Sequence, residues 1–470
     1  MSSHNTIPVD PALPHLPVAL NGAAMAEVLA GLVREHRPET SVEACTVDRI
    51  KYRPRRNLAV SYRLQLRDVQ TGQHFEQLVA TRFCAAGESA QRHAKAQLRA
   101  PAPSLAGPAS SHVAALDMVA AWWPNDPKLG VAASLLGANS QGRHRHVSDA
   151  LSALTGGRAE LVSHQLQLAQ VVPEHRACAR VELSFRAGRA APLEFRTLYV
   201  KTDSEHRGAL THAVMQALHR SAAQADGRLL TPQPILWQGD IGLHWQAALP
   251  GTPLLDASPQ VSASASMRVG ALLAALHSVA VPAPRVVVAQ EWLERLGLVA
   301  HTLVLVEPRW QRAVRALAGS LAANVKTIAT TPNVTLHGDL HPRNVLIDGD
   351  RLGLIDLDSV RHGPAIADLG DWIADAVYRA LLGGHDVADA LVSCRAFLRG
   401  YGQAAQGHCC EAALAWSTAN SLLCQRAWRS VVNLKPGRFA LVESLLEVAT
   451  AILRSGSIDA ALQTRQRLAA

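Results

Sequence analysis

The chain has 470 residues, of which 48% are hydrophobic and 18% charged, so it is long enough for two or three packed units and is not intrinsically disordered. The formal net charge is +8, but the basic residues are scattered and no nucleic-acid-binding motif occurs, so we expect no nucleic-acid partner. Seven cysteines without a Cys-x-x-Cys pair argue against a disulfide framework or a zinc site. The chain start lacks a signal-peptide pattern and no apolar run reaches about 18 residues, which predicts a soluble cytoplasmic protein without a membrane partner.

The first part of the chain predicts an arm, a helix and two strands. Residues 1–20 are rich in proline and are expected to be extended, and a helix is expected over Ala23–Glu35. Apolar and polar residues alternate over Leu58–Leu66 and Phe75–Phe83, which is typical of strands. The segment Pro101–Ser111, PAPSLAGPASS, has the composition of a linker or long loop.

A second strand pair is predicted over Ala177–Phe185 and Leu193–Lys201. Each strand pair follows a proline with nearby basic residues, PRRN at 54–57 and PEHR at 173–176. This spacing of about 120 residues indicates an internal duplication. Two unrelated hairpins would give the same pattern, and this alternative stays open.

Helical periodicity predominates after residue 206, as in HRGALTHAVMQALHRSA, where Leu210, Val214 and Leu218 share one face. Further helices are expected over Ala263–His277, Trp310–Val325, Asp368–Leu382 and Ala415–Val432. One short strand pair, Val345–Ile347 with Leu352–Ile355, flanks the turn DGDR. The sequence therefore predicts an α+β protein with a helical second half.

The segment Thr335–Ser359, TLHGDLHPRNVLIDGDRLGLIDLDS, carries the candidate chemistry. Asp339 and Asn344 stand five residues apart in a polar loop, and Asp356 directly follows the second short strand. A hairpin would bring Asn344 and Asp356 together, and their amide and carboxylate oxygens suit Mg²⁺. A carboxylate such as Asp339 can orient a hydroxyl and accept its proton, which suits phosphoryl transfer. The alternative is a polar loop with capping aspartates.

The run HGDLHPRN…LIDLD resembles the catalytic loop and metal-binding segment of the aminoglycoside phosphotransferase and choline kinase superfamily. The resemblance implies a bilobal protein-kinase-like fold with a β-rich N-terminal lobe and a mainly helical C-terminal lobe. It further implies that Asp339 is the catalytic base, that His337 supports the loop, and that Asn344 and Asp356 bind Mg²⁺. The later segment HGPAIADLGDW is similar to the family's Gly-x-Pro-x-x-Asp-Leu segment, with its aspartate one residue later, and implies that Asp368 braces the loop.

The same resemblance implies a site for ATP or another nucleoside triphosphate. LYVKTD places Lys201 where the family keeps its phosphate-binding lysine, and in the duplication Thr81 would take the equivalent position. LHWQAALPGTPLLD resembles the interlobe hinge. By this likeness the adenine would be bound by the backbone of Gln246, Ala247, Ala248 and Leu249.

Two features of the family have no clear counterpart. The helix glutamate that pairs with the lysine is missing; Glu205 is close in sequence, and His212 or Gln216 could replace it. No glycine-rich phosphate loop precedes Lys201. The turn at Pro173–Arg176 is expected to cover the phosphates. The segment Arg53–Asn57 is the alternative candidate for this role.

The predicted organisation has four parts: an arm and helix (1–40), a cap or degenerate copy of the N-terminal lobe (41–150), the nucleotide-binding lobe (151–250) and the helical lobe with the catalytic loop (251–470). The N-terminal extension resembles that of maltokinase-like and glucosamine-kinase-like members, which implies a sugar or sugar derivative as the small hydroxylated substrate. The segment QRAWRSVVNLKPGR resembles their terminal helices. There Arg426, Trp428 and Arg429 are expected only to pack and cap.

Three other functions stay open at this stage. A non-catalytic binding or scaffold protein could keep the fold, and an aminoglycoside-type antibiotic kinase could keep the chemistry. Phosphorylation of a protein is a third, although no Ala-Pro-Glu signature follows Asp356. The sequence leaves the acceptor, the choice of nucleotide and the oligomeric state open.

Overall fold

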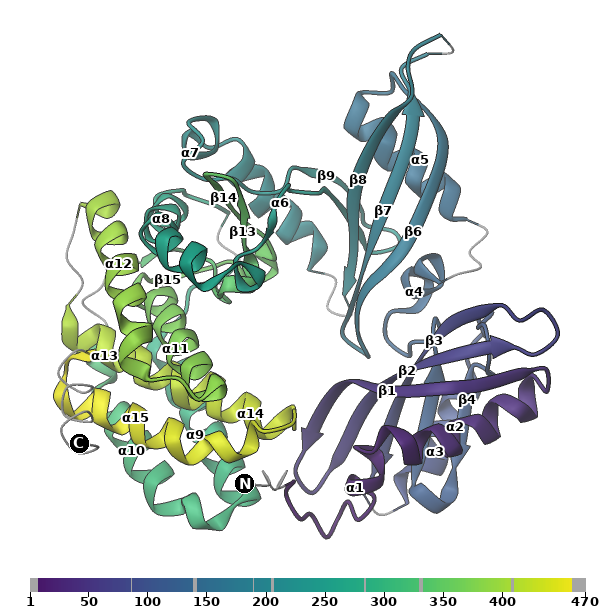
Figure 1. Ribbon diagram of the computed structural model, residues 1–470, viewed down its shortest axis with the longest axis horizontal. Coiled ribbons are helices and arrows are strands. Elements are labelled where there is room, and N and C mark those ends of the chain that lie inside the picture. The colour runs from purple at the N-terminus through teal and green to yellow at the C-terminus, as the bar shows by residue number, and fades with distance from the viewer. Residues whose placement is uncertain are drawn as a thin grey trace. The chain divides into compact units, whose positions relative to one another are not determined.

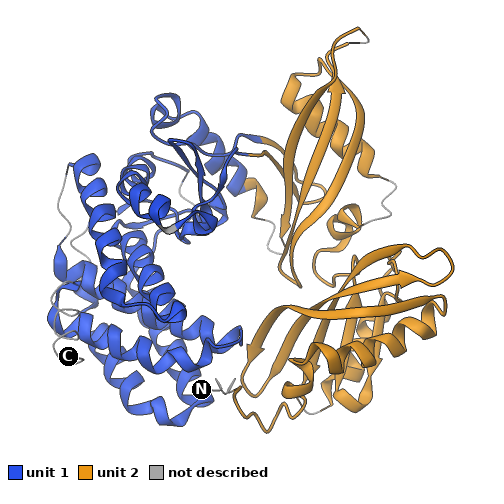
Figure 2. Ribbon diagram, viewed as in Figure 1, with its two compact units in different colours: residues 1–6, 210–234, 249–470 blue, residues 7–209, 235–248 orange. Residues whose placement is uncertain are grey.

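The structure is a computed structural model that describes residues 7–458 except 86, 138–141, 189, 204–206, 283–284, 329–332 and 407–409. The N-terminal half is built on β-sheets and the C-terminal half is mainly helical (Figure 1), which confirms the expected α+β class. The chain divides into two compact units (Figure 2). The first unit along the described chain contains residues 7–209 and 235–248 and is unit 2 in Figure 2. The second contains residues 210–234 and 249–470 and is unit 1 in Figure 2.

The first unit contains two five-stranded sheets with the same strand order. In the first sheet, β1-β2-β3-β5-β4, the strands are β1 (Thr40–Arg53), β2 (Asn57–Asp68), β3 (His74–Cys84), β4 (Ser110–Val113) and β5 (Met118–Trp122). In the second, β6-β7-β8-β10-β9, they are β6 (Glu160–Val172), β7 (Arg176–Arg186), β8 (Glu194–Asp203), β9 (Pro234–Gln238) and β10 (Leu243–Ala247).

The two sheets are copies of one structural repeat. A helix precedes each, α2 (Gly22–His36) and α5 (Arg143–Thr155), and their C-terminal residues are 119 apart. The same spacing separates Arg55 from Glu174, the turn residues with φ of 58° before β2 and β7. The duplication expected from the sequence is therefore present in topology and in register.

The repeat corrects one sequence assignment. Ala59 on β2 pairs with Arg82 on β3, and 119 residues later Cys178 on β7 pairs with Lys201 on β8. The position equivalent to Lys201 is therefore Arg82 and not Thr81. The prediction was wrong by one residue, and a shift of one residue along a strand moves the side chain to the opposite face of the sheet. Only the pairing of neighbouring strands distinguishes the two positions.

Each sheet is closed on one face by its preceding helix. Alternate residues of β2, from Leu58 to Leu66, are buried because side chains two apart point to the same face. Helix α2 packs on β1 and buries Met25, Leu29 and Val33, and its first turn is capped by the side chain of Asn21, which accepts from the Ala23 amide at 3.0 Å. In the second repeat α5 packs on β6 in the same way (Figure 1).

The turn between β6 and β7 is held by the first repeat. The carboxylate of Glu174 forms an ion pair with Arg82 of β3 and lies 3.7 Å from the Lys128 ammonium. The Glu174 amide donates to the Asp126 carboxylate at 2.8 Å. The first sheet thus braces the turn that the sequence marked as a cover for phosphates.

The second unit is a helical bundle with small sheets on one side. Its longer helices are α8 (Pro259–His277), α9 (Ala289–Val306), α10 (Gln311–Ala323), α11 (Ile366–Gly383), α12 (Val387–Ala405), α13 (Glu411–Ser421) and α15 (Val442–Ser455). The helix expected over Ala415–Val432 runs as α13, a π-helical turn (Leu422–Ala427) and α14 (Trp428–Val432). In the part of the chain that the structure describes, no helix combines the length and the apolarity needed to cross a bilayer.

Candidate active site

Two short β-pairs position the polar loop of residues 337–344. Strand β12 (Asn333–Leu336) leads into the loop and pairs with β15 (Arg361–Pro364). The loop ends at the expected hairpin, which consists of β13 (Val345–Asp348) and β14 (Arg351–Leu354). Strand β13 also pairs with β11 (Thr252–Pro253). The Ile355 amide donates to the Asn344 carbonyl at 3.0 Å. The hairpin therefore returns the chain so that Asp356 follows the residue bonded to Asn344.

His337 and Asp368 fix the start of the loop. The His337 side chain is fully buried, and its Nε2 lies 3.0 Å from the carbonyl oxygen of Ile355. The Asp368 carboxylate accepts from the amides of His337, at 2.6 Å, and Gly338, at 2.9 Å. Since Asp368 lies in the first turn of α11, the loop is anchored to a long buried helix.

Asp368 is itself held in its charged form by a buried network. His277 Nε2 lies 3.1 Å from its Oδ2, and His277 Nδ1 lies 2.9 Å from the Tyr401 hydroxyl. Burial opposes ionisation, but the hydrogen bond and charge of His277 outweigh it, so the pKa of Asp368 is below its ordinary value. The loop therefore rests on a carboxylate rather than on a neutral acid.

Gly338 allows the close approach on which the loop depends. Its φ is 77°, in the left-handed region that favours glycine, and an added Cβ would lie 2.3 Å from the Ser359 carbonyl oxygen. Any other residue at this position would push apart the loop and the segment after Asp356.

Asp339 is partly exposed and lies between two cationic or titratable side chains. Its Oδ1 is 3.2 Å from Nη2 of Arg429, and its Oδ2 is 3.8 Å from Nε2 of His341. Burial raises the pKa of Asp339, but the charges of Arg429 and His341 outweigh it, so this pKa lies below the ordinary value. Asp339 is thus a carboxylate at neutral pH, as a general base must be.

The contact between Arg429 and Asp339 was not predicted from the sequence. Arg429 was expected only to pack or cap, yet it contacts the carboxylate of Asp339 from α14. The two residues are 90 positions apart, and no local spacing links them. A signal was present only in the concentration of arginines in QRAWRSVVNLKPGR.

Asn344 and Asp356 have the chemistry for a hard cation. The Asn344 side chain is 4% exposed, and its Nδ2 donates to the Asp339 carbonyl at 3.0 Å, so the oxygen of the amide is the group left to face a cation. Asp356 follows the hairpin with a φ of 60°, a conformation that aspartate tolerates better than most residues. Two oxygen donors of this kind fit Mg²⁺, which takes its remaining ligands from phosphates and water.

The described residues contain no cluster of three or more histidine, cysteine, aspartate or glutamate side chains that could hold a metal alone. A dedicated protein-only metal centre is therefore not found in that part of the chain.

The residues expected to bind the nucleotide lie on β8 and β10 and just beyond. Lys201 is half-buried and pairs in register with His244, and Gln246 and Ala247 pair with Tyr199 and Leu198. The Ala248 amide donates to the Thr197 carbonyl at 3.0 Å. The sheet therefore uses one of the backbone groups that were expected to bind adenine.

The remaining expected nucleotide residues are placed as follows. Leu249 packs against Gly353 of the hairpin. Glu205 lies outside the described residues. His212 and Gln216 contact each other at 3.0 Å on α6 (Gly208–His219), and a role for either beside Lys201 stays a prediction.

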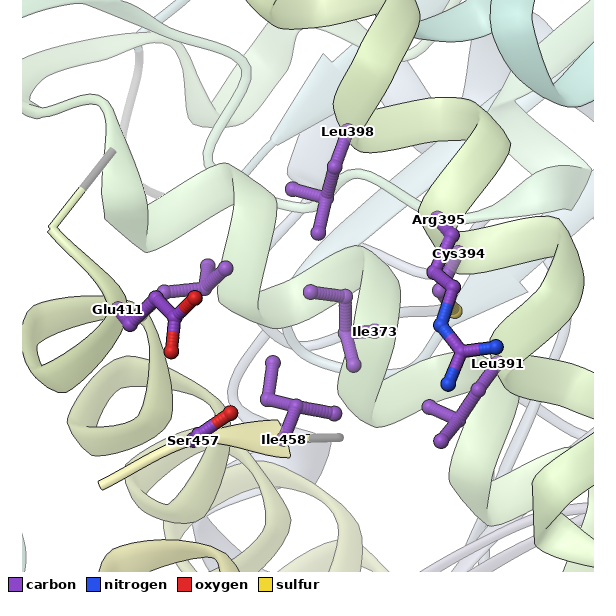
Figure 3. Close-up of a pocket in the computed structure, with 9 residues that line it drawn as sticks. Ile373, Leu391, Cys394, Arg395, Leu398, Glu411, Ser457 and Ile458 are labelled. Atoms are coloured by element: carbon purple, nitrogen blue, oxygen red, sulfur yellow. The ribbon is translucent and has the colours of Figure 1, made fainter. Parts of the chain in front are cut away.

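A separate pocket lies among the helices of the second unit (Figure 3). Its lining is mostly apolar and consists of Ile373, Leu391, Cys394, Arg395, Leu398, Glu411, Leu414, Ser457 and Ile458. None of these is a residue expected in the active site, so we assign the pocket no role in the chemistry.

Comparison with known families gives the class that this site resembles. Residues 192–407 match the model of the phosphotransferase enzyme family, APH. This segment is therefore similar to members of that family. The match spans the catalytic loop and the hairpin described above, and also includes Lys201 and Asp368. The first sheet and Arg429 lie outside it.

Solved structures similar to this chain are small-molecule phosphotransferases. A choline/ethanolamine kinase family protein from Mesorhizobium loti is 15% identical, with 68% of this chain and 97% of that chain covered and a TM-score of 0.43. Aminoglycoside phosphotransferase APH(4)-Ia is 16% identical, with 66% and 99% covered and a TM-score of 0.43. Aminoglycoside phosphotransferase APH(3'')-Id from Streptomyces rimosus is 18% identical, with 59% and 98% covered and a TM-score of 0.38. No curated protein matches the chain.

Proposed function

We propose that this phosphotransferase is a kinase that moves the γ-phosphoryl group of ATP onto a hydroxyl of a small molecule, with a sugar or sugar derivative as the acceptor. The observation that carries the proposal is the braced loop. Asp368 fixes the backbone at residues 337 and 338, which leaves Asp339 partly exposed beside Asn344 and the hairpin that leads to Asp356.

The mechanism assigns one task to each residue. Asp339 orients the acceptor hydroxyl and accepts its proton while the hydroxyl oxygen forms a bond to the γ-phosphorus. The bond between that phosphorus and the β–γ bridging oxygen breaks, and ADP leaves. Asn344 and Asp356 would hold Mg²⁺, whose charge stabilises the phosphate oxygens during transfer.

We assign the nucleotide to the second sheet, residues 151–250, and regard residues 41–150 as the cap. Lys201 would bind the nucleotide phosphates, and the backbone of Gln246, Ala247 and Leu249 with the Ala248 carbonyl would bind adenine. Arg82, which occupies the position of Lys201 in the first sheet, forms an ion pair with Glu174.

A scaffold protein without activity is the second candidate, and the retained set of Asp339, Asn344 and Asp356 weighs against it. An aminoglycoside acceptor is the third, as with the hygromycin B and streptomycin that structures of two similar phosphotransferases contain. A cytoplasmic location belongs to the same proposal.

The test is a screen for ADP release from ATP and Mg²⁺ over sugars, amino alcohols and aminoglycosides. Asp339→Asn should lower acceptor-dependent turnover by at least about a hundredfold, because general base catalysis contributes that much or more. Asp348→Asn, on the exposed turn of the neighbouring hairpin, should leave turnover unchanged. Full activity of soluble Asp339→Asn protein would refute the assignment of the base.

A further inference from the structure

The proposed base lies between two side chains that can carry positive charge. Asp339 Oδ1 faces Arg429 at 3.2 Å, within hydrogen-bond distance, and Oδ2 lies 3.8 Å from His341, beyond that distance. An acceptor hydroxyl must come within about 3 Å of one of these oxygens, so a bound acceptor lies beside the Arg429 guanidinium. The Arg429 side chain is 39% exposed and that of His341 is 17% exposed. Arg429 is therefore the more accessible of the two to an acceptor.

The described surroundings of Arg429 offer it no second carboxylate of the protein. Arg295 of α9 is close to Arg429 and, as a second cation, cannot form an ion pair with it. The Arg295 side chain donates a hydrogen bond to the Cys424 carbonyl at 3.0 Å and stacks 3.9 Å from the centre of the Trp428 ring. Burial lowers the pKa of Arg295, and the positive charge of Arg429 lowers it further. The displaced guanidinium would thus add to a site that is already positive.

The carboxylates behind the loop are already engaged. Asp375 of α11 contacts Arg379 and lies 3.1 Å from Nη1 of Arg426, so one carboxylate serves two guanidinium groups. Asp371 accepts from Gln425 Nε2 at 2.6 Å, and burial raises its pKa, which disfavours its charged form. Neither acid can neutralise Arg429.

From this arrangement we infer that the acceptor carries an anionic group, a carboxylate or a phosphate, and that Arg429 exchanges Asp339 for it when the acceptor binds. The inference rests on the proposed kinase function and specifies its substrate class as an acidic polyol. Two parallel N–H groups of a guanidinium match two anionic oxygens. The exchange couples recognition to catalysis, because the group that binds the acceptor lies beside the base.

An assay of small molecules separated by their charge tests the inference without knowledge of the substrate. A deproteinised small-molecule cell extract is separated on an anion exchanger, and the bound and unbound fractions are each assayed with ATP and Mg²⁺ for acceptor-dependent ADP release. The acceptor should be in the bound fraction. Treating that fraction with alkaline phosphatase, then removing the enzyme, distinguishes a phosphate group, which is lost, from a carboxylate, which survives.

Variants separate recognition from folding. Arg429→Gln should lower kcat/KM for the bound fraction by at least about tenfold, Arg429→Lys should lose less, and Arg312→Gln on the exposed face of α10 should match the unchanged protein. The loss in Arg429→Gln should appear in the KM for the acceptor more than in kcat, because the contact with the anionic group is removed. A merely structural Arg429 would lower kcat without this preference.

The opposing outcomes are distinct. Turnover in the unbound fraction alone would overturn the anionic acceptor and leave the kinase function intact. Loss of acceptor-free hydrolysis in Arg429→Gln, with equal loss for every fraction, would assign Arg429 to the nucleotide and also overturn it. No turnover in any fraction, with ATP bound, would contradict the kinase function itself.

Discussion

Asp368 combines full burial with a negative charge, so it links the loop to the stability of the helical unit. Its pKa in the folded protein is below that of the unfolded chain, so its stabilising contribution is present above about pH 4 and is lost as the pH falls through the folded value. This direction follows from the His277 hydrogen bond and the two loop amides that favour the ionised form.

Asp368→Asn should therefore destabilise the protein at pH 7 by about 3 kcal/mol, the usual effect of breaking a buried charged pair. The difference from the unchanged protein should shrink at pH 3, where the carboxylate of the unfolded chain is mostly protonated. Urea midpoints at the two pH values measure this, with the exposed Asp350→Asn as control. An equal difference at both pH values would show that Asp368 is not ionised in the folded protein.

The candidate site residues that belong to a sequence motif were predicted from the sequence. The contact of Arg429, which belongs to no such motif, was not. His337, Asp339, Asn344 and Asp356 lie within 20 positions of one another, and the order of these residues resembles the motif of a phosphotransferase family. Arg429 reaches Asp339 only because α13, the π-helical turn and α14 set its direction. A π-helical turn shifts the phase of a helix and leaves no pattern in the sequence.

At the scale of elements, the inner strands were predictable and the outer ones were not. β2 and β3 alternate clearly because one face of each is buried. β1 and β6, at the edges of their sheets, contain register shifts that interrupt their alternation. The missed strands were therefore those with the weakest periodic signal.

The catalytic loop should depend on one glycine and tolerate change at another. Gly338→Ala should lower turnover at least tenfold and destabilise the protein by about 2 kcal/mol or more, because left-handed strain is added to a clash with Ser359. Gly349→Ala, in the hairpin turn at φ 56°, meets no atom within 4 Å and adds only the strain, about 1 kcal/mol. Turnover assays and melting curves on both proteins check this, and equal effects would exclude a role for the contact with Ser359.

At the scale of the whole molecule, the two repeats carry a cation at the same position. Lys201→Ala should raise the KM for ATP or lower kcat at least tenfold, since it removes the proposed phosphate contact. Arg82→Ala should change these constants less than threefold and lower the melting temperature, because it breaks the ion pair with Glu174. Steady-state kinetics of both variants decide between the sheets. A larger kinetic effect from Arg82→Ala would move the nucleotide site to the first repeat.

The most direct measurement is the product itself. The protein is incubated with ATP, Mg²⁺ and the acceptor fraction, and ³¹P NMR follows the appearance of a phosphate monoester alongside ADP. We predict a new phosphomonoester signal with the unchanged protein and with Asp350→Ala, and none with Asp356→Ala, which lacks a proposed ligand of the phosphate-bound cation. Inorganic phosphate as the sole product, or an undiminished monoester signal from folded Asp356→Ala, would contradict phosphoryl transfer at this site.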